Sequence, residues 1–244
     1  MVERDSSVLG PRASAFVVVG AAVGTWFVLA PHVAYPGLWP SVVIVAAGVM
    51  PATLLLVLVL LPLWPWRWNV AVAVVLALVA FGCTEESWRL AANFAKLWAA
   101  VFAGWAFLTV FEELLWVVIV ALIIPVVDAI SVFSPHGPTK QIVAHHRAIY
   151  NDVAVAFLVP GGGAAQLGPP DILFYALFLA AAARWKLRPG WTWIATTGMY
   201  GLTIVITAGV TVDGLPALPF LSFGFLVANG DLLWKRLRRA PRQD

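Results

Sequence analysis

Residues 112–133 read EELLWVVIVALIIPVVDAISVF, an apolar run that carries one charged residue, Asp128, after its two leading glutamates. A helix that crosses a bilayer needs about 20 apolar residues, so this run is long enough to span a membrane. A second apolar run, at 168–185, carries Asp171 near its start. Because a carboxylate inside a membrane span costs free energy, we expect both aspartates to have a function and to lie near a partner.

The composition of the whole chain supports this assignment to the membrane. Of its 244 residues, 62% are hydrophobic and only 11% are charged, and the mean hydropathy is +0.92. Soluble domains carry roughly 25% charged residues. The polar segments are too short to form a separate soluble domain, so we predict one all-α domain within the lipid bilayer. Residues 1–111 are expected to form its N-terminal membrane helices, and residues 112–244 further helices with the polar loop 134–167.

The charge pattern does not indicate a nucleic-acid partner. The net charge is +3, and five of the 15 basic residues lie in the C-terminal tail, where charges that flank a membrane helix are expected. These five are Lys235, Arg236, Arg238, Arg239 and Arg242. The single cysteine, Cys83, excludes an intrachain disulfide.

Eight apolar segments are candidate membrane spans because of their length and composition. They lie at 13–30, 38–62, 68–83, 88–110, 112–133, 168–185, 191–211 and 215–234. The third segment is short and the second is long, so seven or nine spans stay open. We therefore predict a polytopic transmembrane helix bundle with about eight spans.

The basic residues predict the orientation of this bundle. With eight spans both termini lie on one side, and that side collects eleven of the 15 basic residues. The positive-inside rule therefore places both termini in the cytoplasm and the loop 134–167 outside the cell membrane.

The two aspartates are expected to lie at similar depth. Asp128 comes six residues before Ser134, where its segment leaves the membrane, and Asp171 comes four residues after Leu167, where the next segment enters. At about 1.5 Å per residue, these positions lie roughly 9 Å and 6 Å from the same membrane surface. Segments joined by one loop run antiparallel, so the two carboxylates can meet.

Two neighbouring carboxylates in a site of low dielectric constant cannot both ionise easily, so such a pair shares a proton. The ionised carboxylate can take a proton from water while the protonated one donates to a peptide carbonyl, which is peptide hydrolysis without a covalent intermediate. Membrane carboxylates also carry protons in transporters. Two aspartates by themselves therefore leave a proton-coupled transporter open.

The residues that follow Asp128 and surround Asp171 resemble two motifs of the presenilin and signal peptide peptidase family of intramembrane aspartyl proteases. Asp128 precedes a short apolar run and then Pro135-His136-Gly137-Pro138, which is similar to the Pro-x-Gly-Pro element of presenilins. Gly168-Pro169-Pro170-Asp171, followed by Phe174-Tyr175, resembles the Gly-x-Gly-Asp motif with its Phe-Tyr pair.

A third resemblance lies near the C-terminus. Pro216-Ala217-Leu218-Pro219, followed by Phe223-Gly224, is similar to the family's Pro-Ala-Leu-Pro motif and the Phe-Gly after it. The three motifs come in the family's order among the spans, and the resemblance covers about 112–234. The chain is therefore identified as similar to a prokaryotic presenilin-like protease.

The resemblance implies the fold, the site and the partners. Asp128 and Asp171 would form a catalytic dyad inside a presenilin-like helix bundle, and the segment 216–219 would adjoin the dyad and touch the substrate. Gly168, Pro169 and Pro170 complete the candidate site. The implied substrates are transmembrane peptides or membrane-protein segments, and no metal or organic cofactor is implied.

Three features depart from the presenilin pattern. Val127 stands where presenilins have tyrosine, and Pro170 replaces the glycine directly before the second aspartate. Proline fits the first turn of a helix, which would place Asp171 in that turn, but it fixes φ where glycine leaves φ free. The predicted orientation is that of signal peptide peptidases, since the corresponding presenilin loop is cytoplasmic. A family member that has lost catalysis and acts as a membrane scaffold is therefore an alternative.

Two further features of the loop have weaker interpretations. His145 and His146 are adjacent and lack a third ligand, so we expect no metal site. Gly161-Gly162-Gly163 lacks the residues of a phosphate-binding loop, and we interpret it as a flexible hinge that lets 139–158 move as a gate over the site.

Overall fold

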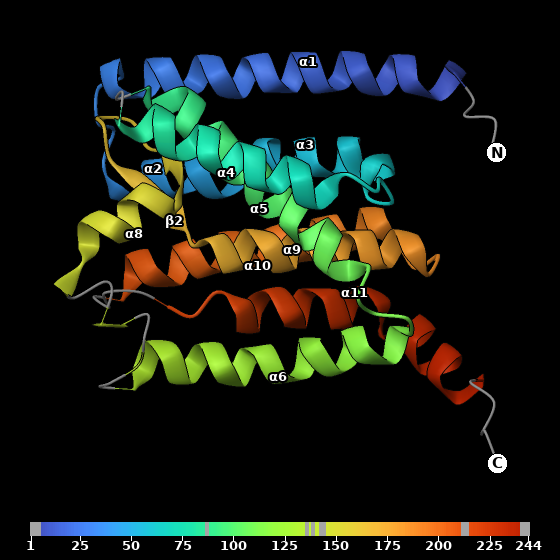
Figure 1. Cartoon of the computed structure of the whole chain (residues 1–244). Coiled ribbons are helices and arrows are strands. Elements are labelled where there is room, and N and C mark those ends of the chain that lie inside the picture. Colours follow the sequence, from blue (N-terminus) through green and yellow to red (C-terminus); the bar gives the residue numbers. More distant parts are fainter. Residues whose placement is uncertain are drawn as a thin grey trace.

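The computed structural model describes residues 6–85, 88–134, 137, 140–141, 145–210 and 215–239. Most of these residues are helical, and the long helices lie side by side with roughly aligned axes (Figure 1). The first half contains α1 (Ser6–Leu29), η1 (Ala30–His32), α2 (Leu38–Val43), η2 (Ile44–Val49), α3 (Met50–Leu60), η3 (Leu61–Leu63), α4 (Asn69–Glu85) and α5 (Arg89–Leu108). The second half contains α6 (Leu114–Phe133), α8 (Arg147–Val153), β1 (Val155–Leu158), β2 (Ala164–Leu167), α9 (Pro169–Arg184), α10 (Pro189–Gly209) and α11 (Leu218–Arg239).

Each of the eight predicted segments coincides with a helix or a continuous helical stretch. Among the described residues, four stretches are long and apolar enough to cross a membrane: Gly10–His32, Leu38–Leu63, Arg89–Leu108 and Leu114–Phe133. A shorter apolar helix covers Asn69–Thr84. The prediction of a mostly helical, membrane-embedded protein is therefore confirmed.

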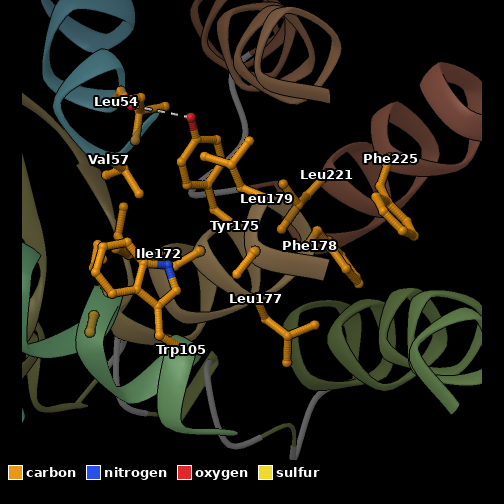
Figure 2. Close-up of a cluster of buried hydrophobic side chains, with 14 of the residues drawn as sticks. Leu54, Val57, Trp105, Ile172, Tyr175, Leu177, Phe178, Leu179, Leu221 and Phe225 are labelled. Atoms are coloured by element: carbon orange, nitrogen blue, oxygen red, sulfur yellow. Dashed lines mark hydrogen bonds between the residues drawn. The ribbon is translucent and has the colours of Figure 1, made fainter. Parts of the chain in front are cut away.

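The helix α9 lies inside the bundle. Every side chain from Tyr175 to Ala182 is at most 1% exposed, and α9 contacts α5, α10 and α11. Figure 2 shows its side chains surrounded by residues from three other helices, namely Leu54, Val57, Trp105, Leu221 and Phe225. Phe178 stacks on Phe225 with ring centroids 4.7 Å apart. A helix that is apolar on all sides is stable in such a buried position.

The helix α5 approaches α9 closely at Gly104. A Cβ atom added to Gly104 would collide with the carbonyl oxygen of Leu173 and come within 3.1 Å of the Cβ of Ala176. Small residues at the interfaces of membrane helices allow backbones to come this near. The crossing therefore holds the N-terminal half of α9 against α5.

The helix α6 is peripheral by comparison. It packs mainly on α11, and Figure 1 shows it at one side of the bundle. Its buried residues are only Leu114, Val117 and Ala121, all in its first half. Eight of its large apolar side chains are exposed, Val126 and Val127 among them, as expected for a surface that faces lipid.

An antiparallel β-hairpin precedes α9. In it, β1 pairs with β2 so that Val155 lies opposite Leu167 and Leu158 opposite Ala164. Gly161 and Gly162 form its turn with φ values of +84° and +91°, which glycine adopts without steric cost. The all-α prediction for the chain did not include this hairpin.

The hairpin is fixed to the helices around it. Asn93 of α5 brackets Ala156, since its Nδ2 donates to the carbonyl oxygen (3.0 Å) and its Oδ1 accepts from the N–H (2.7 Å). Trp26 Nε1 donates to Leu158 O at 2.9 Å, and Gly161 N donates to Ala30 O at 3.1 Å. The prediction of a glycine hinge is therefore wrong: these glycines form a tight, anchored turn, and 155–158 is a paired strand. Within the predicted gate 139–158, residues 139 and 142–144 lie outside the described residues.

Candidate functional site

Three segments that are far apart in the sequence meet at one end of the bundle. Figure 1 shows the C-terminal end of α6, the start of α9 and the start of α11 on the same side, because α6 runs antiparallel to the other two. Asp128, Asp171 and the segment 216–219 are therefore at the same end, as the depth argument predicted for the two aspartates.

Asp128 is half-buried and is bound by the backbone of the third motif. Its Oδ2 accepts a hydrogen bond from the N–H of Leu218 at 3.1 Å. Pro216 and Ala217 precede α11 and are buried, while Leu218 and Pro219 form the start of the helix. Pro219 lacks an N–H, but a residue in the first turn of a helix has no intrahelical acceptor for one.

Asp171 lies in the first turn of α9. Gly168 is the N-cap, Pro169 and Pro170 are the first two helical residues, and Asp171 is the third. The Asp171 carboxylate turns back, and its Oδ2 accepts a hydrogen bond from the N–H of Gly168 at 2.9 Å. Pro170 is accommodated because this turn needs no N–H from it, as the sequence predicted. The helix N-terminus also favours a negative charge at this position.

Gly168 holds Asp171 through its backbone and does not need to be glycine for its conformation. Its φ is −66°, which is open to any residue, and an added Cβ would lie 3.4 Å from Asp171 Oδ2. The N–H of Gly168 is therefore the group that the site uses.

The two aspartates are close enough to interact. Asp171 lies within range of the negative charge of Asp128. Each carboxylate has one oxygen bound by a backbone N–H, from Gly168 for Asp171 and from Leu218 for Asp128. Two interacting carboxylates held in this way at one end of the bundle are candidates to act together on one substrate group.

Two tyrosines at the site were not predicted. Tyr200 of α10 is fully buried, and its hydroxyl donates to the carbonyl oxygen of Asp171 at 2.7 Å. A signal for it was present, because a phenol in an apolar segment needs a hydrogen-bond partner. Its partner could not be deduced, since the sequence does not give the rotation of α10 about its axis.

Tyr150 of α8 is the second unpredicted tyrosine. It is half-buried, whereas every other side chain of α8 is exposed. Burial, followed by the negative charges of Asp171 and Asp128, raises the pKa of Tyr150 to about 12. The phenol therefore stays protonated at physiological pH and lies near both carboxylates. No feature of the loop sequence distinguished this tyrosine.

The Pro-x-Gly-Pro element is described only at its glycine, and Pro135, His136 and Pro138 lie outside the described residues. Gly137 is buried, and its N–H donates to Ser134 O at 3.0 Å. A Cβ at this position would collide with the carbonyl oxygen of Ser131. The glycine is therefore required for the close turn at the end of α6.

A shallow and widely open apolar groove lies between the C-terminal half of α6 and the start of α11. It is lined by Pro125, Val126, Ala129, Ile130, Phe133, Ser134 and Pro219. Among the described residues, no group of three or more metal-ligating side chains comes together, and His145 and His146 are exposed.

No model of a known protein family matches the chain, and no curated protein matches it either.

Proposed function

We propose that this protein is an intramembrane aspartyl protease of the presenilin and signal peptide peptidase type, with Asp128 and Asp171 as its catalytic dyad. The observation that carries the proposal is the hydrogen bond from Leu218 N to Asp128 Oδ2, with Asp171 in range of the same carboxylate. This contact joins the motif segments around Asp128 and Leu218, and it is the arrangement that the resemblance implies.

The proposed reaction is hydrolysis of a peptide bond by water. The ionised aspartate takes a proton from the attacking water while the protonated aspartate donates its proton to the scissile carbonyl oxygen, which yields a neutral tetrahedral diol. The newly protonated aspartate then returns its proton to the nitrogen while the other aspartate takes the proton of one diol hydroxyl, so that the C–N bond breaks and an amine and a carboxylic acid are released. The dyad ends with one proton, as it began.

A membrane-spanning substrate would have to unwind locally, because a helix keeps its carbonyls in internal hydrogen bonds. The outer edge of β2 is suited to hold such an unwound segment. Asn93 binds the N–H and C=O of Ala156, so these groups point away from β2. In an antiparallel pair, the residue opposite such a position also directs its N–H and C=O away from its partner strand, and the same holds two residues along. The backbone groups of Gln166 and Ala164, which lie opposite Ala156 and Leu158, therefore point outward from β2. These groups have no partner among the described residues, and β2 leads directly into Gly168 and Asp171.

The apolar groove on α6 suits the portion of the substrate that stays helical. Its lining lies on the lipid-facing side of α6 and continues to Pro219, next to the Leu218 that binds Asp128. A substrate helix lying in this groove could pass its unwound end to the strand edge by β-augmentation.

The proposal includes eight membrane spans in a prokaryotic cell membrane, with both termini in the cytoplasm. In support, the basic residues Arg184, Lys186 and Arg188 lie at the end of α9 that is opposite to Asp171. The aspartates would then lie toward the outer side of the membrane, where water can reach them through the loop region.

The deciding experiment measures cleavage of a single-span model substrate by the purified protein in detergent and in liposomes. Wild type is expected to cleave, and Asp128→Ala and Asp171→Ala are expected to reduce cleavage to background. Asp231→Ala is the matched control, because this aspartate lies near the other end of α11 in an exposed ion pair with Arg188. Substrate binding without cleavage by wild type would indicate a scaffold instead, and proton-linked uptake into liposomes would indicate a transporter.

A further inference from the structure

The hydroxyl of Tyr200 binds the backbone of a proposed catalytic residue. It donates to the carbonyl oxygen of Asp171 at 2.7 Å, and the Tyr200 side chain is 0% exposed. Tyr200 also lies within range of the negative charges of Asp171 and Asp128. A buried phenol at this position therefore contacts the main chain of the site from a helix that contributes neither aspartate.

The first turn of α9 has few other restraints. Pro169 and Pro170 supply no N–H to this turn. The N–H groups of Asp171 and Ile172 donate to Gly168 O at 3.1 and 3.4 Å, and the N–H of Gly168 donates to Asp171 Oδ2. The ends of helices fray more readily than their centres. The hydrogen bond from the Tyr200 hydroxyl to Asp171 O restrains this turn at Asp171 itself, the proposed catalytic residue.

Tyr200 is itself held firmly. Its ring packs against that of Tyr175 with centroids 6.1 Å apart. The next residue, Gly201, brings α10 so close to η2 that an added Cβ would lie 3.2 Å from Ala46 O. The position of the hydroxyl is therefore set by packing between α10, η2 and α9 rather than by a flexible side chain.

We infer that Tyr200 is a positioning residue, whose hydroxyl holds the first turn of α9 so that Asp171 faces Asp128 at the distance needed to share a proton. The inference rests on the proposed function. With Gly168 bound to Asp171 Oδ2 and Tyr200 bound to Asp171 O, the residue is held at both its side chain and its backbone. These two hydrogen bonds together stabilise the first turn of α9, in which Pro170 stands at the position that is glycine in presenilins.

The test compares Tyr200→Phe with Tyr175→Phe, measuring kcat, KM and the pH dependence of cleavage. The two tyrosines are matched: both are buried in the same ring pair, and each donates one hydrogen bond to a backbone carbonyl, Tyr175 to Leu54 O at 3.3 Å. Tyr200→Phe is expected to lower kcat about tenfold with little change in KM, because one hydrogen bond that aligns the dyad is lost. It is also expected to shift the limbs of the pH profile, which report the coupled dyad. Tyr175→Phe is expected to change stability but neither kcat nor the pH profile.

Wild-type kcat and pH profile in Tyr200→Phe would overturn the inference, and so would equal changes in both variants. If Tyr200→Phe does not fold, replacement of Tyr200 by 3-fluorotyrosine keeps the ring and alters the acidity of the hydroxyl. An unchanged pH profile in that protein would also count against the inference. Failure of the wild type to cleave would instead contradict the proposed function, so the two failures are distinguishable.

Discussion

At the scale of single residues, the site uses backbone N–H groups to hold both carboxylates. Leu218 binds Asp128 through its backbone N–H, a group that nearly every residue type could supply at this position. Proline is the one residue type that cannot supply this donor. The start of α9 shows that two consecutive prolines are accepted at the first two positions of a helix, which are the positions of Leu218 and Pro219 in α11.

Leu218→Pro is therefore expected to keep the fold and lower kcat roughly 10- to 100-fold. This range corresponds to the loss of a hydrogen bond to a charged group, worth about 1.5–3 kcal/mol. Leu218→Ala retains the N–H and should reduce kcat much less, although loss of a buried side chain lowers the free energy of unfolding by about 2 kcal/mol or more. Steady-state cleavage assays and thermal unfolding of both variants separate the two effects. Equal kcat values for the two variants would contradict the role given to the N–H.

At the scale of elements, α8 is tied to its neighbours beside the dyad. Lys96 Nζ of α5 donates to Asn151 O at 3.3 Å, and Gln166 of β2 donates to Asn151 Oδ1 at 3.1 Å. These bonds leave Tyr150 as the side chain of α8 that turns toward the aspartates. The helix thereby brings one half-buried phenol within range of the charges of both carboxylates.

The pKa of Tyr150 can show whether this tyrosine lies near the two aspartates, and its measurement does not depend on catalytic activity. Because burial and two negative charges disfavour the phenolate, its pKa is raised from 10.0 to about 12. The stability contributed by the neutral phenol is thus fully present below pH 10 and is lost as the pH rises through about 12. The difference in phenolate absorbance between wild type and Tyr150→Phe should titrate near pH 12.

Removing a carboxylate should move this titration. In Asp171→Asn or Asp128→Asn the midpoint is expected to fall, since one of the opposing negative charges is gone. Asp231→Asn, which removes a distant carboxylate, should leave the midpoint where it is. A midpoint that is the same in all four proteins would mean that α8 does not lie over the dyad.

The crossing of α5 and α9 at Gly104 can be tested by adding one methyl group. Gly104→Ala places a methyl group against the carbonyl of Leu173, so α9 has to shift. The expected loss is about 1–3 kcal/mol of unfolding free energy, as for other overpacked cores. The rate of cleavage should fall as well, because Asp171 lies in the first turn of the displaced helix.

Gly198→Ala in α10 is the control for this crossing, since no heavy atom lies within 4 Å of the added Cβ. Its unfolding free energy should change little or rise slightly, because alanine favours helix over glycine by up to about 1 kcal/mol. Unfolding of both proteins in mixed detergent measures the difference. If Gly104→Ala is as stable and active as Gly198→Ala, the crossing does not position α9.

At the scale of the whole molecule, the helices could be predicted because apolar runs of membrane length have few alternatives to helix. The apolar runs could not show which helix lies inside the bundle. The segments at 112–133 and 168–185 look alike in composition, yet α6 faces outward and α9 is buried. A segment that is apolar all round carries no periodic signal for its buried face.

The hairpin was missed for a different reason. Short runs at 155–158 and 164–167 joined by a glycine-containing turn are typical of a hairpin, but the hinge interpretation of Gly161-Gly162-Gly163 left the two runs beside it out of account. Within the site, the shared depth of the two aspartates followed from chain geometry. The bonds from Leu218 and Tyr200 depend on tertiary packing, and only the first was anticipated, through the resemblance to presenilins.

The orientation of the molecule can be tested with single cysteines in a Cys83→Ser background. Ala148 in α8 and Gly190 at the start of α10 are both exposed, and they lie in the segments that precede and follow α9. An impermeant maleimide should label Ala148→Cys in intact cells, and Gly190→Cys only after the membrane is opened. The reason is that the basic residues gather on the Gly190 side, which the positive-inside rule assigns to the cytoplasm. Arg12→Cys should behave like Gly190→Cys, because six spans separate the two positions if eight cross in total. Labelling of Arg12→Cys together with Ala148→Cys would show that an even number of spans, and not the predicted five, precedes the loop, whereas the depth of the aspartates is counted from the loop itself and would not change.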